Sequence, residues 1–231
     1  MEPSFTPYLD KPNQWSSHSQ IILYLAALQP GTSVLDIGTA TGTIGRMGQN
    51  LGLRLTGIEP NPDWADKARP YYEAIEIGTI ETCPEQFLRE KQVIILADVL
   101  EHMPDPAQSL KYLMNLQSND TRLIISVPNI ANISIRLSLL LGNWNYTERG
   151  ILDKTHLQFF TRKTILQMLA KLNLKVENIW STPIPLEKVS PFFENSILGR
   201  MIYRLLKIAT DIFPTVLGYQ FVITARKNNP C

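Results

Sequence analysis

A short turn with one acidic residue and two glycines is the part of this sequence that most directly suggests chemistry. It reads VLDIGTATG over residues 34–42, where an apolar run passes into small residues, and Asp36 stands two positions before Gly38. Small residues let a nucleotide-derived ligand lie against bare backbone, and a nearby carboxylate can accept hydrogen bonds. The turn therefore predicts a cofactor site at the end of a buried strand.

A second acidic residue follows the next apolar run of the chain. Glu59 ends the run RLTGIE and stands 21 residues after Gly38. A carboxylate at this distance is typical of ribose recognition in dinucleotide-binding folds, so the spacing alone also suits NAD. The dinucleotide pattern G-x-G-x-x-G lacks its first glycine here because Ala40 occupies that position. The pattern D-x-G-x-x-x-G, formed by Asp36, Gly38 and Gly42, fits better.

The elements that must position these residues follow an alternating order. Apolar runs predict parallel strands over residues 33–38, 54–60, 74–80, 92–100 and 121–129. Amphipathic segments between them predict helices, so the order indicates a doubly wound, Rossmann-like α/β fold. Two further strands, over 175–183 and 219–227, predict a C-terminal antiparallel hairpin. The expected sheet is mostly parallel and has seven strands.

The chain is expected to form one domain over residues 1–231, with three attached segments. Residues 1–29 predict an N-terminal cap helix region, and residues 130–160 predict a lid over the substrate. Residues 186–214 predict a helical insertion between the last two strands, with basic residues beside apolar ones. We expect that apolar stripe to pack onto its own domain, and peripheral membrane contact is the alternative.

Four motifs in order resemble those of a known family over roughly residues 30–130. The Asp36 turn resembles motif I of the class I S-adenosylmethionine-dependent methyltransferases, with Ala40 where the middle glycine is common. GIEPNP and IGTIET resemble the segments that follow the second and third strands of that family. IILADVLEHMPDP, residues 94–106, is similar to the fourth-strand region of small-molecule methyltransferases of the ubiquinone-biosynthesis type.

The resemblance implies S-adenosylmethionine as cofactor and a set of residues that bind it. The implied set is Asp36, Gly38, Thr39, Ala40, Gly42, Glu59, Pro60, Thr79, Ile80, Ala97 and Asp98. Glu59 would take the ribose hydroxyls, and Thr79 stands where an aspartate often reaches the adenine. We expect Ala40 to be tolerated if its φ is negative. A non-catalytic methyltransferase-like partner protein and, less favoured, an NAD-linked oxidoreductase stay open as alternatives.

Two of the three histidines are candidates for catalysis. His102 follows the fourth strand and His156 lies in the expected lid, so either could take a proton from an acceptor hydroxyl. The alternatives are that His102 caps the turn MPDP and that His156, with Asp153, belongs to a loop that plugs the sheet. The apolar residues expected to form that plug are Leu157, Phe159 and Phe160.

The composition excludes several other classes of function. The 22 basic and 21 acidic residues give a net charge of +1, which offers no electrostatic case for nucleic acid. Cys83 and Cys231 suggest neither a disulfide framework nor a zinc cluster, so no metal site is expected and a cytoplasmic location fits. No run is apolar and long enough to span a bilayer. The expected reaction is methyl transfer to a small molecule, with oxygen as the favoured acceptor.

Overall fold

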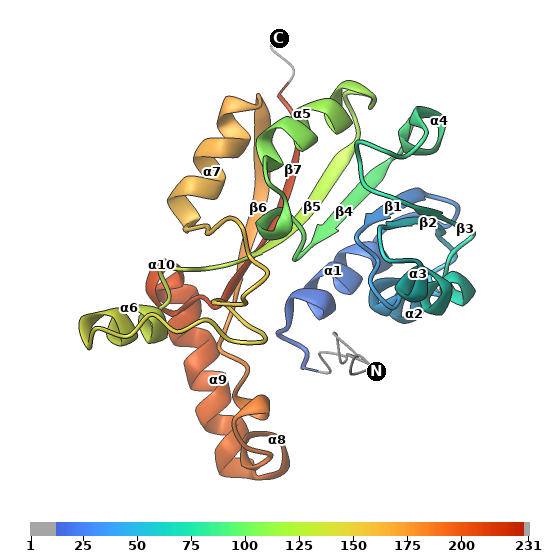
Figure 1. Ribbon diagram of the computed structural model, residues 1–231. Coiled ribbons are helices and arrows are strands. Elements are labelled where there is room, and N and C mark those ends of the chain that lie inside the picture. The colour runs from blue at the N-terminus through green and yellow to red at the C-terminus, as the bar shows by residue number, and fades with distance from the viewer. Residues whose placement is uncertain (1–12, 229–231) are drawn as a thin grey trace, which may run out of the picture.

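A seven-stranded sheet forms the centre of the computed structural model, which describes residues 13–228 (Figure 1). The strand order is β3-β2-β1-β4-β5-β7-β6. The strands are β1 (Ser33–Ile37), β2 (Arg54–Glu59), β3 (Ala74–Ile77), β4 (Val93–Ala97), β5 (Arg122–Pro128), β6 (Leu174–Thr182) and β7 (Gln220–Lys227). The first five are parallel, and β7 lies antiparallel between β5 and β6. The predicted fold class is confirmed. Residues 1–12 of the expected cap region, and Cys231, lie outside the described residues.

The register of the central strands brings three strand ends to one edge. Ile37, the last residue of β1, pairs with Ile58 of β2 and with Leu96 of β4. The turn after β1, Glu59 at the end of β2 and Ala97 at the end of β4 therefore emerge side by side. Open α/β sheets bind ligands at this edge, at the point where the strand order reverses.

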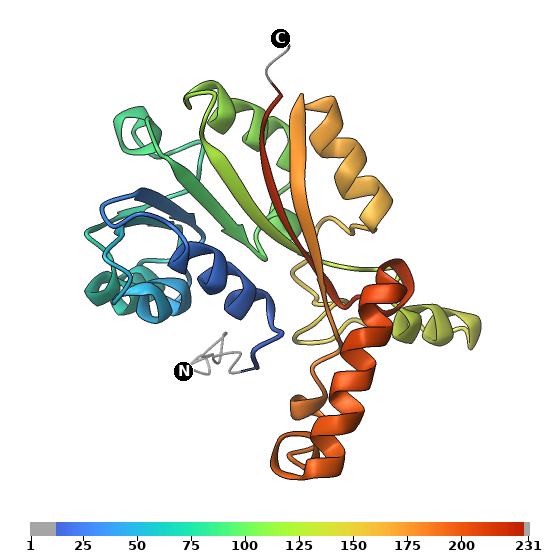
Figure 2. The ribbon, with the colours of Figure 1, turned by 180° about the vertical axis from the view of Figure 1, so that it is seen from behind.

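Helices cover both faces of the sheet, which explains why its central strands are apolar throughout. The helices α4 (Glu85–Leu88), α5 (Pro106–Asn115) and α7 (Arg162–Lys171) pack on one face, and α1 (Ser17–Ala26) and α2 (Thr43–Gly48) pack on the other (Figures 1 and 2). Successive β4 residues alternate between the two cores: Ile94 belongs to the first and Ile95 to the second. Short α3 (Pro62–Ala68) and the 3-10 turn η1 (Arg69–Tyr71) connect β2 to β3.

The segment between β5 and α7 contains a helix that the sequence did not predict. This helix, α6 (Ile133–Leu140), is capped by the side chain of Asn132. The side-chain amides of Asn129 and Asn132 both donate to the carbonyl oxygen of Gly218, which ties the segment to the chain entering β7. Of the three residues expected to plug the sheet, Phe160 is buried, but Leu157 is 57% exposed. The expectation for Leu157 was wrong.

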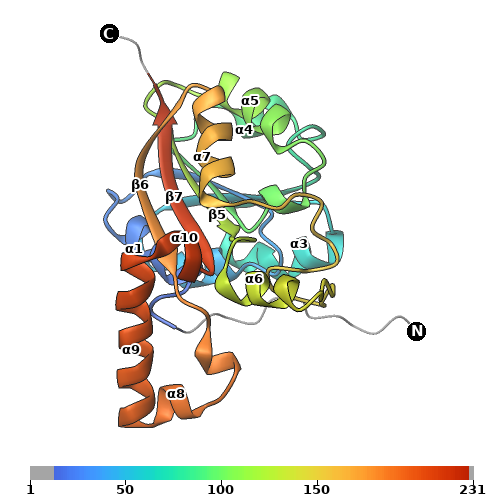
Figure 3. The same ribbon diagram turned by 90° about the vertical axis from the view of Figure 1, so that its left-hand side faces the viewer.

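The insertion between β6 and β7 projects away from the sheet (Figures 1 to 3). It contains η3 (Leu186–Lys188), α8 (Phe192–Asn195), the long α9 (Ile197–Ile212) and α10 (Pro214–Leu217). The apolar stripe of α9 is largely exposed, at Leu198, Met201, Leu205, Ile208 and Ile212. The expectation that this stripe packs onto its own domain was therefore wrong for most of its length. Tyr203 is the exception, because its ring is buried and lies 4.8 Å from that of Trp15. Among the described residues, no helix has the length and apolar character needed to cross a bilayer.

Candidate functional site

A cavity of about 980 Å³ opens at the carboxyl ends of β1, β2 and β4. Ten of the eleven residues predicted to bind the cofactor line it: Asp36, Gly38, Thr39, Ala40, Glu59, Pro60, Thr79, Ile80, Ala97 and Asp98. Gly42 is the one that does not. A volume of this size lies within the range of roughly 300–1,000 Å³ that is typical of cofactor and ligand sites. The motifs that follow separate strands in the sequence therefore share one pocket.

The turn after β1 depends on residues with positive φ angles. Gly38 has a φ of 71°, and a Cβ atom there would come within 2.8 Å of the Val99 side chain. Gly42 has a φ of 86° and precedes α2, and a Cβ atom there would meet the backbone of Ala68 at 2.9 Å. Gly42 therefore shapes the turn from outside the cavity. Ala40 has a φ of 48°, so the expected condition of a negative φ is not met.

Two backbone amides hold the side chain of Glu59, at the end of β2, beside this turn. The N–H of Ala40 donates to its Oε2 at 2.8 Å, and the N–H of Asn61 donates to its Oε1 at 3.0 Å. Burial raises the pKa of the Glu59 carboxyl, and these two hydrogen bonds lower it. A carboxylate oxygen can accept two hydrogen bonds, so each oxygen keeps acceptor capacity beside the cavity. This donor and acceptor arrangement fits the two hydroxyls of a ribose.

Asp36 is fixed by a residue that the sequence analysis missed. The side chain of Asp36 is 1% exposed, and the Tyr72 hydroxyl donates to its Oδ2 at 2.5 Å. The same phenol oxygen accepts from the backbone N–H of Gly45 at 3.0 Å. Burial raises the pKa of Asp36 to about 7, against the lowering effect of the Tyr72 hydrogen bond. No local pattern in the sequence links Tyr72 to a residue 36 positions away, so only the fold shows it.

Asp98, directly after β4, is oriented by two later strands. Its Oδ1 accepts from the Ser126 hydroxyl at 2.6 Å and from the Gln220 side-chain amide at 2.8 Å. Ser126 belongs to β5 and Gln220 begins β7. The antiparallel β7 thus helps to orient a residue that lines the pocket, although no β7 residue lines it, and this link was not predicted from the sequence.

The third-strand motif forms another part of the wall. The backbone N–H of Thr79 donates to the Thr82 hydroxyl at 2.8 Å, and Ser109 of α5 donates to the carboxylate of Glu81. Ile80, which is buried, lines the cavity beside them. Further lining comes from residues that were not predicted from the sequence, among them Trp64, Met103, Gln108 and Tyr112. His18 of α1 also lines the cavity.

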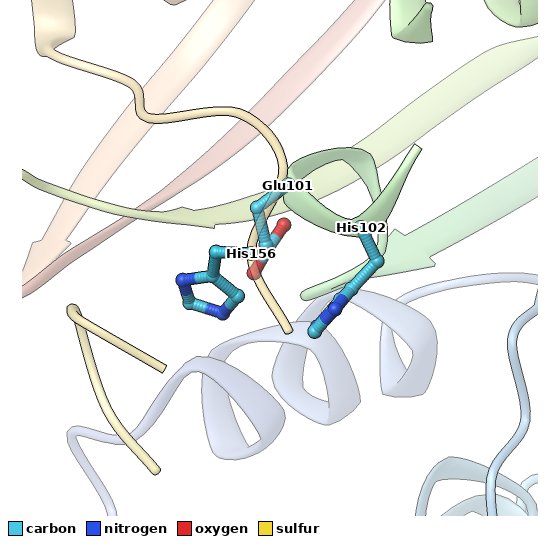
Figure 4. Close-up of side chains that lie close together, drawn as sticks. All are labelled: Glu101, His102 and His156. Carbon is cyan, nitrogen blue, oxygen red and sulfur yellow. The ribbon is translucent and has the colours of Figure 1, made fainter. Parts of the chain in front are cut away.

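The two candidate catalytic histidines meet although 54 positions separate them in the sequence. Their ring centroids lie 4.8 Å apart at an interplanar angle of 75°, and Glu101 lies beside both (Figure 4). His102 lines the cavity, whereas His156 is not among the lining residues. Burial lowers the pKa of His156, and the neighbouring His102 lowers it further. His102 and Glu101 lie on the 3-10 turn η2 (Leu100–His102) after β4.

Segment 153–158 is fastened to η2 through the backbone. The carbonyl oxygen of Glu101 accepts from the N–H groups of Leu157 at 2.7 Å and Gln158 at 2.9 Å. Asp153 is buried and accepts from the Thr155 N–H at 2.8 Å and the Thr155 hydroxyl at 2.7 Å. Asp153 therefore braces this loop, while Thr155 lines the cavity.

Comparison with known proteins agrees with this geometry. The family model described as a methyltransferase domain matches residues 13–179, more than half of the chain. A ubiquinone biosynthesis O-methyltransferase of Glaesserella parasuis is 31% identical over 109 residues, which cover 43% of this chain and 46% of that protein. An uncharacterized 37.1 kDa protein of a Streptomyces fradiae transposon is 26% identical over 81% of this chain and 55% of its own length. The chain thus spans about half the length of these curated relatives.

The fold is also shared with solved structures. Magnesium protoporphyrin IX methyltransferase from Synechocystis, crystallised with bound S-adenosylhomocysteine, superposes with a TM-score of 0.64 at 13% identity, over 96% of this chain and 91% of that one. At this identity the likeness shows the fold alone. Together with the family match and the four motifs at the strand ends, it leads to one conclusion. The chain belongs to the methyltransferase domain family and has the class I S-adenosylmethionine-dependent methyltransferase fold.

Proposed function

We propose that this chain transfers a methyl group from S-adenosylmethionine to a hydroxyl oxygen of a small molecule. The observation that carries the proposal is the position of Glu59 at the end of β2. Two backbone amides orient its carboxylate beside the cavity, and Gly38, whose φ is positive, contributes only backbone to the lining. These features suit a nucleoside with a free ribose diol.

Different residues of the chain would contact different parts of the cofactor. Glu59 would hold the ribose, Thr79 and Ile80 would border the adenine, and Ala97 and Asp98 would lie near the methionine part. When bound, S-adenosylmethionine supplies a methyl group already activated on a sulfonium. The protein then has to align donor and acceptor and to remove the acceptor's proton. This division explains why a clear cofactor site is accompanied by few reactive side chains.

The acceptor end lies where His102 and Thr155 line the cavity. An imidazole at this position can take a proton from a hydroxyl as the carbon–oxygen bond forms. The name of the Glaesserella parasuis relative, an O-methyltransferase, supports oxygen as the acceptor. The proposed general base is His102, with His156 as its partner in segment 130–160, the proposed substrate lid.

The two alternatives from the sequence are less well supported. Ala40 and Thr79, whose departures from the common motifs kept a non-catalytic role open, both line the cavity. Ala40 even contributes its amide to the orientation of Glu59. An NAD-linked oxidoreductase is disfavoured by the antiparallel pair β6 and β7 and by the family match.

Calorimetry with three ligands tests the proposal. The full chain should bind S-adenosylhomocysteine with micromolar affinity, about −8 kcal/mol, and S-adenosylmethionine similarly. NAD should bind far more weakly. Tighter binding of NAD would contradict the proposal. A labelled methyl donor offered with fractionated metabolites should then mark a hydroxylated product, and cofactor binding without any labelled product would favour the non-catalytic alternative.

A further inference from the structure

Glu101, His102 and His156 form a cluster of potential metal ligands beside the cofactor pocket. One ligand atom from each of these residues lies within 4.8 Å of one ligand atom from each of the other two. Glu101 and His102 extend from η2, and His156 comes from the segment that follows α6, so the three side chains converge from two directions (Figure 4). No metal site was expected from the sequence, because Cys83 and Cys231 are far apart along the chain. This cluster uses imidazoles and a carboxylate instead.

Both histidines are oriented as metal-binding histidines usually are. Nδ1 of His102 lies 3.3 Å from the carbonyl oxygen of Thr155, and Nδ1 of His156 lies 3.1 Å from the carbonyl oxygen of Ile151. A carbonyl oxygen can only accept, so each Nδ1 carries the proton in these hydrogen bonds. The lone pair of each neutral ring is then on Nε2. Backbone carbonyls commonly fix ligating histidines in this way, setting the tautomer and the ring orientation.

Thr155 strengthens the arrangement around His102. The Thr155 hydroxyl donates its hydrogen to Asp153 at 2.7 Å. Its oxygen lies 3.2 Å from Nδ1 of His102 and can therefore act only as an acceptor toward that nitrogen. Nδ1 of His102 therefore faces two acceptor oxygens of the same residue. Both favour the tautomer that leaves Nε2 of His102 available.

Glu101 supplies the negative charge of the cluster. Its side chain is 1% exposed and lies beside the two histidines in the interior of the protein. Its backbone carbonyl also holds the N–H groups of Leu157 and Gln158, directly after His156. The backbone thus fixes the distance between η2 and His156 independently of the side chains.

We propose that Glu101, His102 and His156 bind one divalent transition-metal ion, with zinc as the reference. Two imidazoles and one carboxylate are a common ligand set of catalytic zinc sites, which keep a fourth position open. Ligand atoms about 2.1 Å from zinc lie roughly 3.4 Å from one another in a tetrahedron. The three side chains therefore draw together slightly by side-chain rotation when the ion binds.

Because His102 lines the cavity at the proposed acceptor end, the open position of the ion would be reached from the pocket. Use of the metal in catalysis rests on the proposed function, whereas metal binding itself does not.

The acceptor would be a hydroxyl compound whose oxygen binds the ion, such as a phenol or a catechol. Its O–H proton leaves to solvent, and the oxygen attacks the methyl carbon. The carbon–sulfur bond breaks with its electron pair remaining on sulfur, which leaves a neutral thioether and the methyl ether. The ion then does the work otherwise assigned to a general base.

Metal titration of the full, untagged chain tests the site directly. After treatment with EDTA and removal of the chelator, Zn²⁺ should bind at close to one ion per chain, and Co²⁺ should give the visible absorption of a low-coordinate site. His102→Ala, His156→Ala and Glu101→Gln should each weaken Zn²⁺ binding at least about 100-fold. That loss exceeds the roughly 10–100-fold expected when a group that merely orients a ligand is removed. His18→Ala, which removes the third histidine, is the matched control and should bind Zn²⁺ like the wild type.

The outcomes separate this inference from the proposed function. Wild-type binding weaker than about 100 μM, or unchanged binding in His156→Ala, would overturn the metal site. If Glu101→Gln fails to fold, the two histidine variants decide, because both side chains are only half-buried. Calorimetry with S-adenosylhomocysteine on the same samples reports the cofactor site separately. Cofactor binding without metal binding overturns the inference alone, and metal binding without cofactor binding overturns the proposed function alone.

Discussion

The hydroxyl of Tyr72 donates a hydrogen bond of 2.5 Å to the buried carboxyl group of Asp36. Because the same oxygen accepts from the Gly45 amide, one phenol links the end of β1 to the first turn of α2. These two hydrogen bonds hold the turn between β1 and α2, which lines the proposed cofactor pocket, in place. Asp36 contributes to the site by holding this turn as well as by lining the cavity.

Removing the Tyr72 hydroxyl should loosen the turn. Tyr72→Phe leaves both Asp36 and the Gly45 amide without this partner, so we expect a loss of about 1–3 kcal/mol in the free energy of unfolding. Urea denaturation measures it, and calorimetry should show weaker S-adenosylhomocysteine binding. Tyr71→Phe removes the neighbouring phenol hydroxyl and serves as control. Equal effects of the two variants would contradict the bracing role.

The raised pKa of Asp36 predicts a pH dependence of stability. In the unfolded chain this carboxyl titrates near 3.8, and in the folded chain near 7. The folded state therefore favours the protonated form, so stability from this group is present below pH 3.8 and is lost as the pH rises through 7. Linkage sets the size at up to about 4 kcal/mol. Asp36→Asn should flatten the difference in urea stability between pH 5 and pH 8, and an unchanged slope would show that Asp36 is not its source.

Glu59 should matter for both affinity and stability. Glu59→Ala removes the acceptor for the Ala40 and Asn61 amides as well as the proposed ribose contacts. We expect about 1.5–3 kcal/mol less S-adenosylhomocysteine affinity, or roughly 10- to 150-fold, and a lower melting temperature. Asp63→Asn, which neutralises an exposed carboxylate four positions away, is the control and should change neither. Unchanged affinity with a lowered melting temperature would limit Glu59 to a structural role.

Ala40→Gly should stabilise the protein. A φ of 48° costs alanine roughly 1–2 kcal/mol, while glycine adopts it freely but gains entropy in the unfolded chain. The net gain should be below about 1 kcal/mol, with cofactor binding equal or tighter. Ala27→Gly, at the exposed end of α1 where φ is −87°, should instead destabilise by about 0.5–1 kcal/mol. Large loss of binding in Ala40→Gly would mean that the alanine methyl shapes the turn.

The histidine pair should control turnover and leave cofactor affinity nearly unchanged. Once an acceptor is identified, His102→Ala or His156→Ala should lower kcat by about 10²–10⁴-fold. Affinity for S-adenosylhomocysteine should stay within about threefold, which serves as the internal control. Full turnover in the double variant would show that alignment alone carries the reaction.

The sequence predicted those parts of the candidate site that lie at or next to the ends of single strands. Asp36, Gly38 and Glu59 are recognisable because a polar or glycine residue ends an apolar run, and parallel strands bring such ends together. Tyr72, Gln220 and Glu101 could not be found this way. Tyr72 and Gln220 contact the site through hydrogen bonds that span 36 and 122 positions, and Glu101 meets His156 through tertiary packing.

Two errors came from treating local preference as decisive. Alanine by itself prefers a negative φ. In the structure Ala40 has a positive φ, and in this conformation its N–H donates a hydrogen bond to Glu59. The stripe of α9 has the periodicity of a packed helix, and periodicity does not say whether a partner surface is present. Leu205, on that stripe, is 63% exposed.

The two hydrogen bonds that the Glu101 carbonyl accepts make the opening of segment 153–158 measurable by amide hydrogen exchange. Segment 153–158 cannot lift from η2 unless the amides of Leu157 and Gln158 leave that oxygen. Each such opening would expose two adjacent amide protons to solvent, and deuterium taken up at these positions would record it. Because this segment belongs to the proposed substrate lid, the exchange of these two protons would measure how often the proposed lid opens, without any knowledge of the acceptor.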